Sequence, residues 1–319
     1  MPRRSAPHFL IYINISQPGY VYFCFNQFIT TMEKAIEQVY QRPARPGMVG
    51  DGFRVFNYFP NGGISQQRVS PFLMMDFNAE YDFGASEHIR GVDVHPHKGF
   101  ETVTIAYKGS VAHHDSTGNS GVINPGDVQW MTAGAGVLHK EYHEQEFSKR
   151  GGPFEMVQLW VNLPAKHKLT APNYQAITAG QMGKVTLPGN AGTVNVIAGE
   201  FNEQTGPATT FTPVNMFDIR LNAGGTLTTT TPASHNTVML VVSGKVTVNN
   251  ETAPLHSLVL FKNEAGEISI KAEQDSVLLL LSGEPINEPI AQYGPFVMNT
   301  NQELQEAFEE FRSGKFGVL

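Results

Sequence analysis

The sequence predicts an all-β protein that ends in a helix. Short segments in which apolar and polar residues alternate recur along most of the chain, and a period of two is typical of strands with one buried face. Glycine (31 residues) and proline (20 residues) are plentiful, as expected where many short strands are joined by turns. The second half also repeats the order of segments found in the first half, which indicates two similar β domains.

Four segments of the first half predict strands. Turn residues bound them: Pro60-Asn61-Gly62-Gly63 follow the first segment, Lys108-Gly109 follow the second, and Pro125-Gly126-Asp127 precede the third. Pro164 ends the fourth, because proline removes a backbone donor and restricts the preceding residue. The expected strands are residues 53–59, 102–107, 128–131 and 155–163.

The second half resumes this pattern. Residues 238–248 resemble residues 104–111, with Gly244 at the hairpin position that Gly109 holds in the first half. Residues 255–261 take the place of the strand that follows Pro125-Gly126-Asp127 in the first half. We therefore expect one duplicated β unit in each half.

The stretch between the halves is rich in turn residues and predicts a linker. Pro172, Gly180 and Gly183 interrupt it, and no alternation is evident. The expected organisation is an N-terminal extension (1–31), a first β domain (32–164), a linker (165–184), and a second β domain that includes the C-terminal helix (185–319).

The C-terminal segment predicts a helix. Thr300 and Glu303 have the spacing of a capping box, in which each side chain accepts a hydrogen bond from the other residue's backbone. Gly314 is a suitable stop. Between the capping box and Gly314, one apolar stripe with helical spacing is formed by Leu304, Ala307, Phe308 and Phe311. We expect this stripe to dock on a barrel rather than on a membrane.

Composition excludes several classes of function. The formal net charge is −7 and basic residues are scattered, so no direct binding of nucleic acid is expected. The single cysteine, Cys24, cannot form an intrachain disulfide, and a cytoplasmic location is expected. Residues 1–31 contain Arg3 and Arg4 but no lysine or acidic residue, and their apolar run is too short to span a membrane. They are interpreted as a disordered or adventitious extension.

Histidines and one carboxylate form the most informative pattern. His95-Pro96-His97 and His139-Lys140-Glu141 are two pairs of metal-ligand residues with one residue between them. Residues i and i+2 of a strand point to the same face, so two neighbouring strands could direct three imidazoles and one carboxylate to one point. Six of the 11 histidines lie in the segment from His95 to His143. This concentration argues against the alternative that they only form the polar rim of a hairpin. Such a donor set suits Fe(II), Mn, Ni, Co, Cu or Zn.

These motifs resemble the pirin family of the cupin superfamily. The resemblance rests on the stretches HPHKGFETVT and NPGDVQWMTAGAGVLHKE, and it extends from about Asp51 to the C-terminus. It implies two tandem cupin (jelly-roll) barrels, with the metal in the first. In many cupins the residue that matches Glu101 is a ligand, whereas in pirins the carboxylate ligand matches Glu141. We therefore interpret Glu101 as a neighbour of the ligands, with the alternative that it coordinates the metal left open.

The resemblance also implies an activity. It indicates a dioxygenase of the quercetin 2,3-dioxygenase type, which cleaves flavonols with dioxygen and releases carbon monoxide. His95, His97, His139 and Glu141 would hold one divalent transition metal, of which Fe(II) is favoured. Glu141 would also be the catalytic base that takes the proton of the flavonol 3-hydroxyl.

A second hypothesis is a protein without enzymatic activity. Some pirins resemble metal-dependent regulators that bind a transcription factor or a metabolic enzyme, and the oxidation state of the metal would then control that surface. Both hypotheses require the same ligands. The second barrel is expected to lack a metal, because its histidines, His235 and His256, stand alone.

Overall fold

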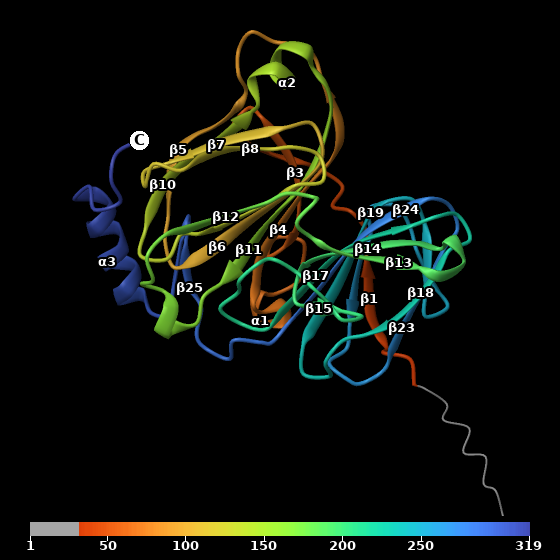
Figure 1. Ribbon diagram of the computed structural model, residues 1–319. Coiled ribbons are helices and arrows are strands. Elements are labelled where there is room, and N and C mark those ends of the chain that lie inside the picture. Colours follow the sequence, from red (N-terminus) through yellow and green to blue (C-terminus); the bar gives the residue numbers. More distant parts are fainter. Residues whose placement is uncertain (1–31) are drawn as a thin grey trace, which may run out of the picture. The chain divides into compact units, whose positions relative to one another are not determined.

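A computed structural model describes residues 32–319, in which most strands belong to two β-barrels and helices are few (Figure 1). The N-terminal barrel consists of a seven-stranded sheet and a four-stranded sheet. In spatial order the larger sheet contains β12 (Asn173–Ile177), β9 (Val128–Thr132), β6 (Phe100–Lys108), β11 (Gly152–Asn162), β4 (Phe72–Phe83), β3 (Phe53–Phe59) and β2 (Gly47–Val49). The smaller sheet contains β5 (Gly91–His97), β10 (Val137–His143), β7 (Val111–Asp115) and β8 (Ser120–Ile123).

The C-terminal barrel repeats this arrangement of seven and four strands. Its larger sheet contains β1 (Ile36–Tyr40), β22 (Leu258–Phe261), β19 (Asn236–Ser243), β24 (Ser276–Gly283), β17 (Val214–Leu221), β14 (Gly192–Ala198) and β13 (Gly183–Leu187). Its smaller sheet contains β18 (Thr226–Thr230), β23 (Glu267–Ala272), β20 (Val246–Val248) and β21 (Glu251–Ala253). The prediction of two cupin barrels is confirmed.

Short elements complete the fold. Two further strand pairs are β15 (Glu200–Phe201) with β16 (Gln204–Thr205) and β25 (Ala291–Tyr293) with β26 (Phe296–Met298). The helices are α1 (Gln66–Val69), α2 (Gln145–Arg150) and α3 (Asn301–Arg312), and the 3-10 turns are Ala165–His167 and Pro188–Asn190.

The predicted strands and helix are largely confirmed. Residues 53–59 form β3 as expected, and the other three predicted segments of the first half lie in β6, β9 and β11. The predicted segment 238–248 forms two strands, β19 and β20, because the chain turns at Gly244 with φ 85°. The capping box of Thr300 and Glu303 is present at the start of α3, and Gly314 follows its end with φ 78°.

Strand pairing corrects the predicted domain boundaries. Residues 36–40 were assigned to the first domain, but β1 pairs with β22 in the C-terminal barrel (Figure 1). The stretch 165–184 is not a linker, because β12 pairs with β9 of the N-terminal barrel and β13 begins within the stretch. The extension 1–31 lies outside the described residues.

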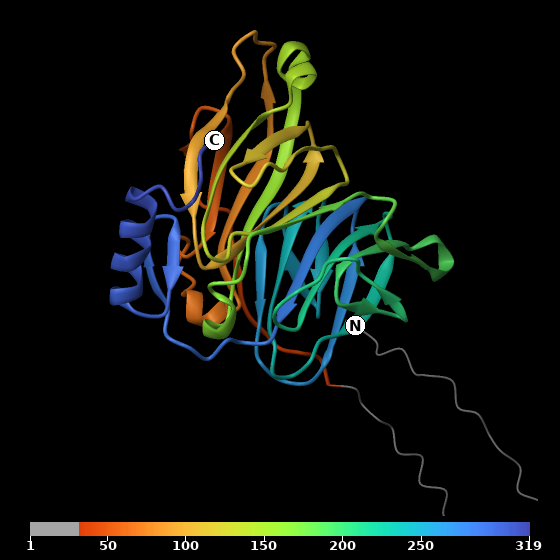
Figure 2. The ribbon, with the colours of Figure 1, turned by 60° about the vertical axis from the view of Figure 1, so that its left-hand side comes forward.

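The C-terminal helix also crosses to the other barrel. Helix α3 contacts β25 and β26, and Lys98 of the N-terminal barrel forms a backbone bridge to Phe296 in β26. Figures 1 and 2 show α3 beside the N-terminal barrel from two directions. Each barrel is thus completed by a segment from the opposite end of the described chain.

The two barrels share one hydrophobic core. On β4 and β11, alternate residues such as Phe77 and Leu159 pack against Leu240 and Leu281 of the C-terminal barrel. The intervening residues of the same strands point into the N-terminal barrel, because side chains alternate between the two faces of a strand. The interior of the C-terminal barrel is filled by a separate apolar cluster that includes Phe217, Met239 and Phe261.

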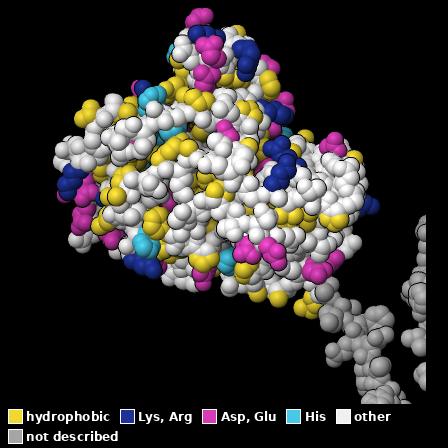
Figure 3. Space-filling view, viewed as in Figure 1, with side chains coloured by type: hydrophobic (Ala, Val, Ile, Leu, Met, Phe, Trp, Pro, Cys, Tyr) yellow, Lys and Arg dark blue, Asp and Glu magenta, His cyan; other side chains and the backbone are white. Residues whose placement is uncertain are grey.

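The described helices are all too short or too polar to cross a membrane. On the face of residues 32–319 that Figure 3 shows, acidic and basic side chains are interspersed.

Candidate metal centre

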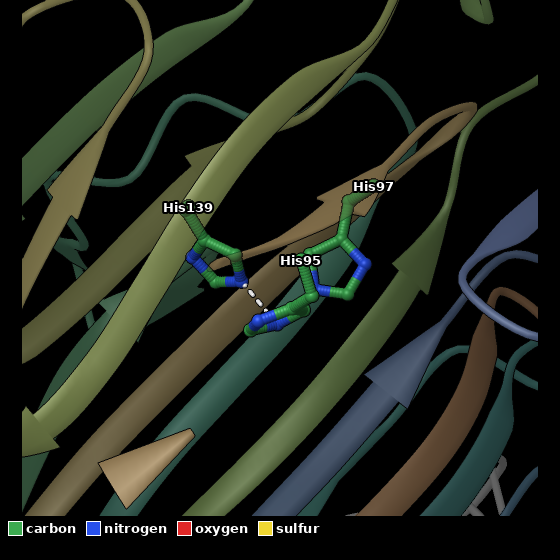
Figure 4. A group of neighbouring side chains, drawn as sticks. All are labelled: His95, His97 and His139. Atoms are coloured by element: carbon green, nitrogen blue, oxygen red, sulfur yellow. Dashed lines mark hydrogen bonds between the residues drawn. The ribbon is translucent and has the colours of Figure 1, made fainter. Parts of the chain in front are cut away.

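Three histidines converge inside the N-terminal barrel. His95 and His97 lie two residues apart on β5, and His139 pairs with His95 across the β5–β10 ladder. The Nε2 atoms of His95 and His139 are 2.8 Å apart, and the three ring centroids lie 4.3–4.8 Å from one another (Figure 4). One donor atom from each residue lies within 4.8 Å of the others. The strand parity that the sequence suggested therefore holds for these three residues.

The three imidazoles fit a divalent transition metal. Burial lowers the pKa of His95, and it lowers the pKa of His97 and His139 well below the usual value, with neighbouring histidines adding to the effect for these two. Neutral imidazole is the form that binds metals. The carbonyl oxygen of Asp93 lies 2.8 Å from Nδ1 of His95, which orients that ring and leaves Nε2 for the centre. Two imidazole Nε2 atoms that face each other at 2.8 Å in a buried site are well satisfied by a shared cation.

Glu141 lies close by but has its own partners. It is 7% exposed, and its carboxylate accepts hydrogen bonds from Thr104 Oγ1 (3.3 Å) and Gln158 Nε2 (3.5 Å). Burial raises the pKa of Glu141 to about 7. The register of β10 against β5 shifts between His139 and Glu141. Among the described residues, the group of donor atoms within 4.8 Å contains the three histidines and not Glu141.

Glu101 is separated from this group by a turn. The strand does not continue from His97 to Glu101, because β5 ends at His97 and β6 begins at Phe100 in the other sheet. Glu101 is 1% exposed, pairs with Thr132 across β9, and accepts a 2.7 Å hydrogen bond from Thr132 Oγ1. Burial raises the pKa of Glu101 to about 7. Glu101 is not in the group of donor atoms that the three histidines form, and its role beside the ligands stays a prediction.

Two buried lysines hold the turn that follows His97. Lys98 Nζ donates to the carbonyl oxygen of Ala135 (2.8 Å) and to Glu310 Oε2 on α3 (2.6 Å). Lys168 Nζ donates to the carbonyl oxygen of Gly99 (2.9 Å). Ala135 lies in the loop that precedes β10, so Lys98 connects the turn after β5 and this loop with the C-terminal helix. Sequence reasoning missed this role of Lys98, for which the only signal is its position next to the His95-Pro96-His97 motif.

A cavity of about 310 Å³ lies beside His95 and His97, which form part of its lining. Its apolar lining includes Met74, Trp160 and Met156, and its polar lining includes Glu141 and Gln158. Trp160 contacts His97, with ring centroids 5.3 Å apart. Asp76 and Asn78 on β4 also line this cavity. Sequence reasoning missed these two residues, because polar residues that alternate with apolar ones are equally typical of a strand that faces solvent.

Family comparison agrees with this geometry. Residues 52–161 match the family model described as Pirin, and residues 216–317 match the model described as Pirin C-terminal cupin domain. A Pseudomonas aeruginosa protein named "Putative quercetin 2,3-dioxygenase PA2418" is 45% identical over 268 residues, which cover 84% of this chain and 93% of that protein. The chain belongs to the pirin family.

Other pirin relatives extend this result. Pirin of Mus musculus is 38% identical over 257 residues, covering 79% of this chain and 84% of the mouse protein. The crystal structure of quercetin 2,3-dioxygenase from Acinetobacter baumannii is 47% identical and superposes with a TM-score of 0.85, covering 90% of this chain and 99% of that one. The pirin family models and this superposition therefore agree on the family and the fold of this chain.

Three further histidines of the pirin barrels have hydrogen-bond partners outside the group of His95, His97 and His139. In the N-terminal barrel, His143 Nε2 lies 2.8 Å from the carbonyl oxygen of Gly52. In the C-terminal barrel, His235 Nδ1 lies 3.0 Å from Ser282 Oγ, and Arg42 donates to His256 Nδ1 at 3.0 Å. Each of these rings is thus engaged in a hydrogen bond.

Proposed function

We propose that this pirin is a metal-dependent dioxygenase that cleaves flavonols such as quercetin. The observation that carries the proposal is the convergence of three neutral imidazoles at a largely apolar cavity that also contains the carboxylate of Glu141. The names of the Pseudomonas and Acinetobacter relatives support this choice of substrate class. The net reaction joins both atoms of dioxygen to the opened ring system and releases carbon atom 3 as carbon monoxide.

We further propose that His95, His97, His139 and Glu141 hold one metal ion, with Fe(II) as the native metal. Mn, Ni, Co, Cu and Zn suit the same donors, and the structure supports a metal site without selecting among them. When bound, the metal would supply a Lewis acid for the substrate oxygen and an electron path to dioxygen.

Residues of the chain would provide binding and proton transfer. The faces of Trp160 and Met74 offer an apolar wall for a flat ring system. An oxygen of Glu141 would take the proton of the flavonol 3-hydroxyl, since a buried carboxyl with a raised pKa is a suitable acceptor at neutral pH. Thr104 and Gln158 would hold that carboxylate in place through the hydrogen bonds described above.

The test is oxygen uptake together with carbon monoxide release on addition of quercetin, with protein loaded separately with each candidate metal. We expect turnover with at least one metal, and we expect it to be lost in His95→Ala. Protein that binds metal at the three histidines but consumes no oxygen with any of the six metals would refute the dioxygenase. No observation in the structure favours the regulatory hypothesis. A protein partner and a cytoplasmic location also stay predictions.

A further inference from the structure

Asn78 has an unusual environment for a buried amide. It lies on β4, is 2% exposed, and lines the cavity described above. Neither its Nδ2 nor its Oδ1 has a hydrogen-bond partner among the described residues. A buried amide without partners is unfavourable, so such a group needs a ligand or a water molecule in the folded protein.

The other polar side chains of the cavity are already occupied. Asp76 accepts a 2.8 Å hydrogen bond from Asn57 Nδ2. Gln158 Oε1 accepts a 2.6 Å hydrogen bond from Thr104 Oγ1, and its Nε2 donates to Glu141. Asn78 therefore differs from Asp76 and Gln158, because neither its donor nor its acceptor is paired with another described residue.

The position of Asn78 is set by the strand register. Met74 pairs with Trp160 across β4 and β11, and Trp160 contacts His97 at the metal centre. Asn78 lies four residues further along β4, opposite Met156. It is therefore roughly 13 Å along the strand from the pair of Met74 and Trp160. The amide thus lies at the end of the cavity remote from the histidines.

We propose that Asn78 is a specificity residue that binds the hydrogen-bonding end of the substrate remote from the metal centre. This inference rests on the proposed function and deepens it by naming the substrate feature that is recognised. A carboxamide presents one acceptor and one donor side by side, and adjacent hydroxyl groups on an aromatic ring present the complementary pair. The favoured substrates are flavonols with a catechol ring, and the apolar neighbour Met156 would pack on the ring itself.

Equilibrium binding tests the proposal independently of turnover. Quercetin carries adjacent hydroxyls on its outer ring, and galangin lacks both while keeping the metal-binding 3-hydroxyl. Both are titrated anaerobically into Zn(II)-loaded protein, with quenching of protein fluorescence as the signal. We expect wild-type protein to bind quercetin about tenfold more tightly than galangin, as two net hydrogen bonds would give.

The variants are Asn78→Leu, which keeps the branched shape but is larger and cannot form hydrogen bonds, and Asn78→Ala, in case leucine disturbs the fold. Each variant should bind quercetin and galangin with about equal affinity. Persisting binding of galangin shows that the cavity of the variant is intact. An unchanged preference in a variant that still binds galangin would overturn the proposal, and it would indicate that water alone satisfies the amide. Absence of binding of both flavonols to wild-type protein would also overturn it.

The two proposals fail differently. If the preference depends on Asn78 but no metal supports oxygen uptake, the dioxygenase fails and flavonol recognition stands. If oxygen uptake occurs but substitution of Asn78 leaves the preference unchanged, the dioxygenase stands and the specificity residue fails.

Discussion

Thr132 Oγ1 of β9 donates a hydrogen bond of 2.7 Å to Glu101 Oε1 of β6 in the N-terminal barrel. Glu101 is engaged by a neighbouring strand and does not line the cavity, whereas Glu141 does. Burial raises the pKa of both residues to about 7, so the different roles proposed for them rest on position rather than on acidity.

Replacing each carboxylate by an amide should separate these roles. We expect Glu141→Gln to weaken metal binding modestly and to lower oxygenase turnover by about 10²–10⁴-fold, the range for a lost general base. Glu101→Gln keeps an acceptor for Thr132, so its loss should stay within roughly 10–100-fold. Metal content and turnover are measured for both variants. The reverse ranking would assign the carboxylate ligand to Glu101.

Metal content should be one ion per chain. The motivation is the single group of converging histidines in the described residues. Elemental analysis of protein purified without chelator should show one equivalent, and the double variant His95→Ala, His139→Ala should show none. Removal of the ion by a chelator should lower Tm, because a ligand that binds only the folded state stabilises it. A second ion that survives the double substitution would contradict the site.

The link between Lys98 and Glu310 should slow metal release. Lys98 is buried, and its partner on α3 is partly exposed. We expect Glu310→Gln to destabilise the fold by about 1–2 kcal/mol and to accelerate loss of the metal to a chelator several-fold, because Lys98 then anchors the turn after His97 less firmly. Glu309→Gln is the control, since it changes an exposed carboxylate on the same helix. Equal release rates in the two variants would show that α3 does not influence the centre.

His256 should make the fold sensitive to acid. Burial, with the nearby Arg42 guanidinium as a further cause, lowers the pKa of His256 to about 4 from 6.5. Between those pH values the unfolded chain binds more protons at this position, so the contribution to stability is complete above pH 6.5 and is lost as the pH falls toward 4.

His256→Asn should reduce this acid sensitivity. Asparagine tolerates the positive φ of 59° at this position and does not titrate. The unfolding free energy of wild-type protein relative to the variant should fall by about 1–2 kcal/mol between pH 7 and pH 4, after allowance for solvent screening of a partly exposed ring. Denaturant titrations at the two pH values measure this difference. A constant difference would show that His256 does not titrate differently in the folded and unfolded states.

The convergence of His95 and His97 could be predicted because it depends on local geometry. Two residues separated by one residue share a face in any strand, so the formation of β5 is enough to place His95 and His97 on the same face. Glu101 was ambiguous for the same reason: its parity matches, but the turn at Lys98 and Gly99 moves it to another sheet. Such a turn is short and contains a single glycine. A sequence pattern does not distinguish it from a bulge within one continuous strand.

Long-range pairing could not be predicted. The ladder between β1 and β22 joins residues more than 200 positions apart, and nothing in the sequence of residues 36–40 specifies a partner. Asn78 was missed because its role depends on which face of β4 points inward. That choice is made by packing of Phe77 against the C-terminal barrel, which only the folded structure reveals.

Helix α3 reaches the metal-binding barrel from far along the chain, and this fixes an order of events during synthesis. Glu310 is made 212 residues after Lys98. At ordinary elongation rates that interval is roughly 10–40 s. During this time the nascent first barrel lacks the contact of Lys98 with Glu310. A chain still on the ribosome would therefore present histidines that exchange metals freely. Retention of a metal would begin when α3 emerges and docks.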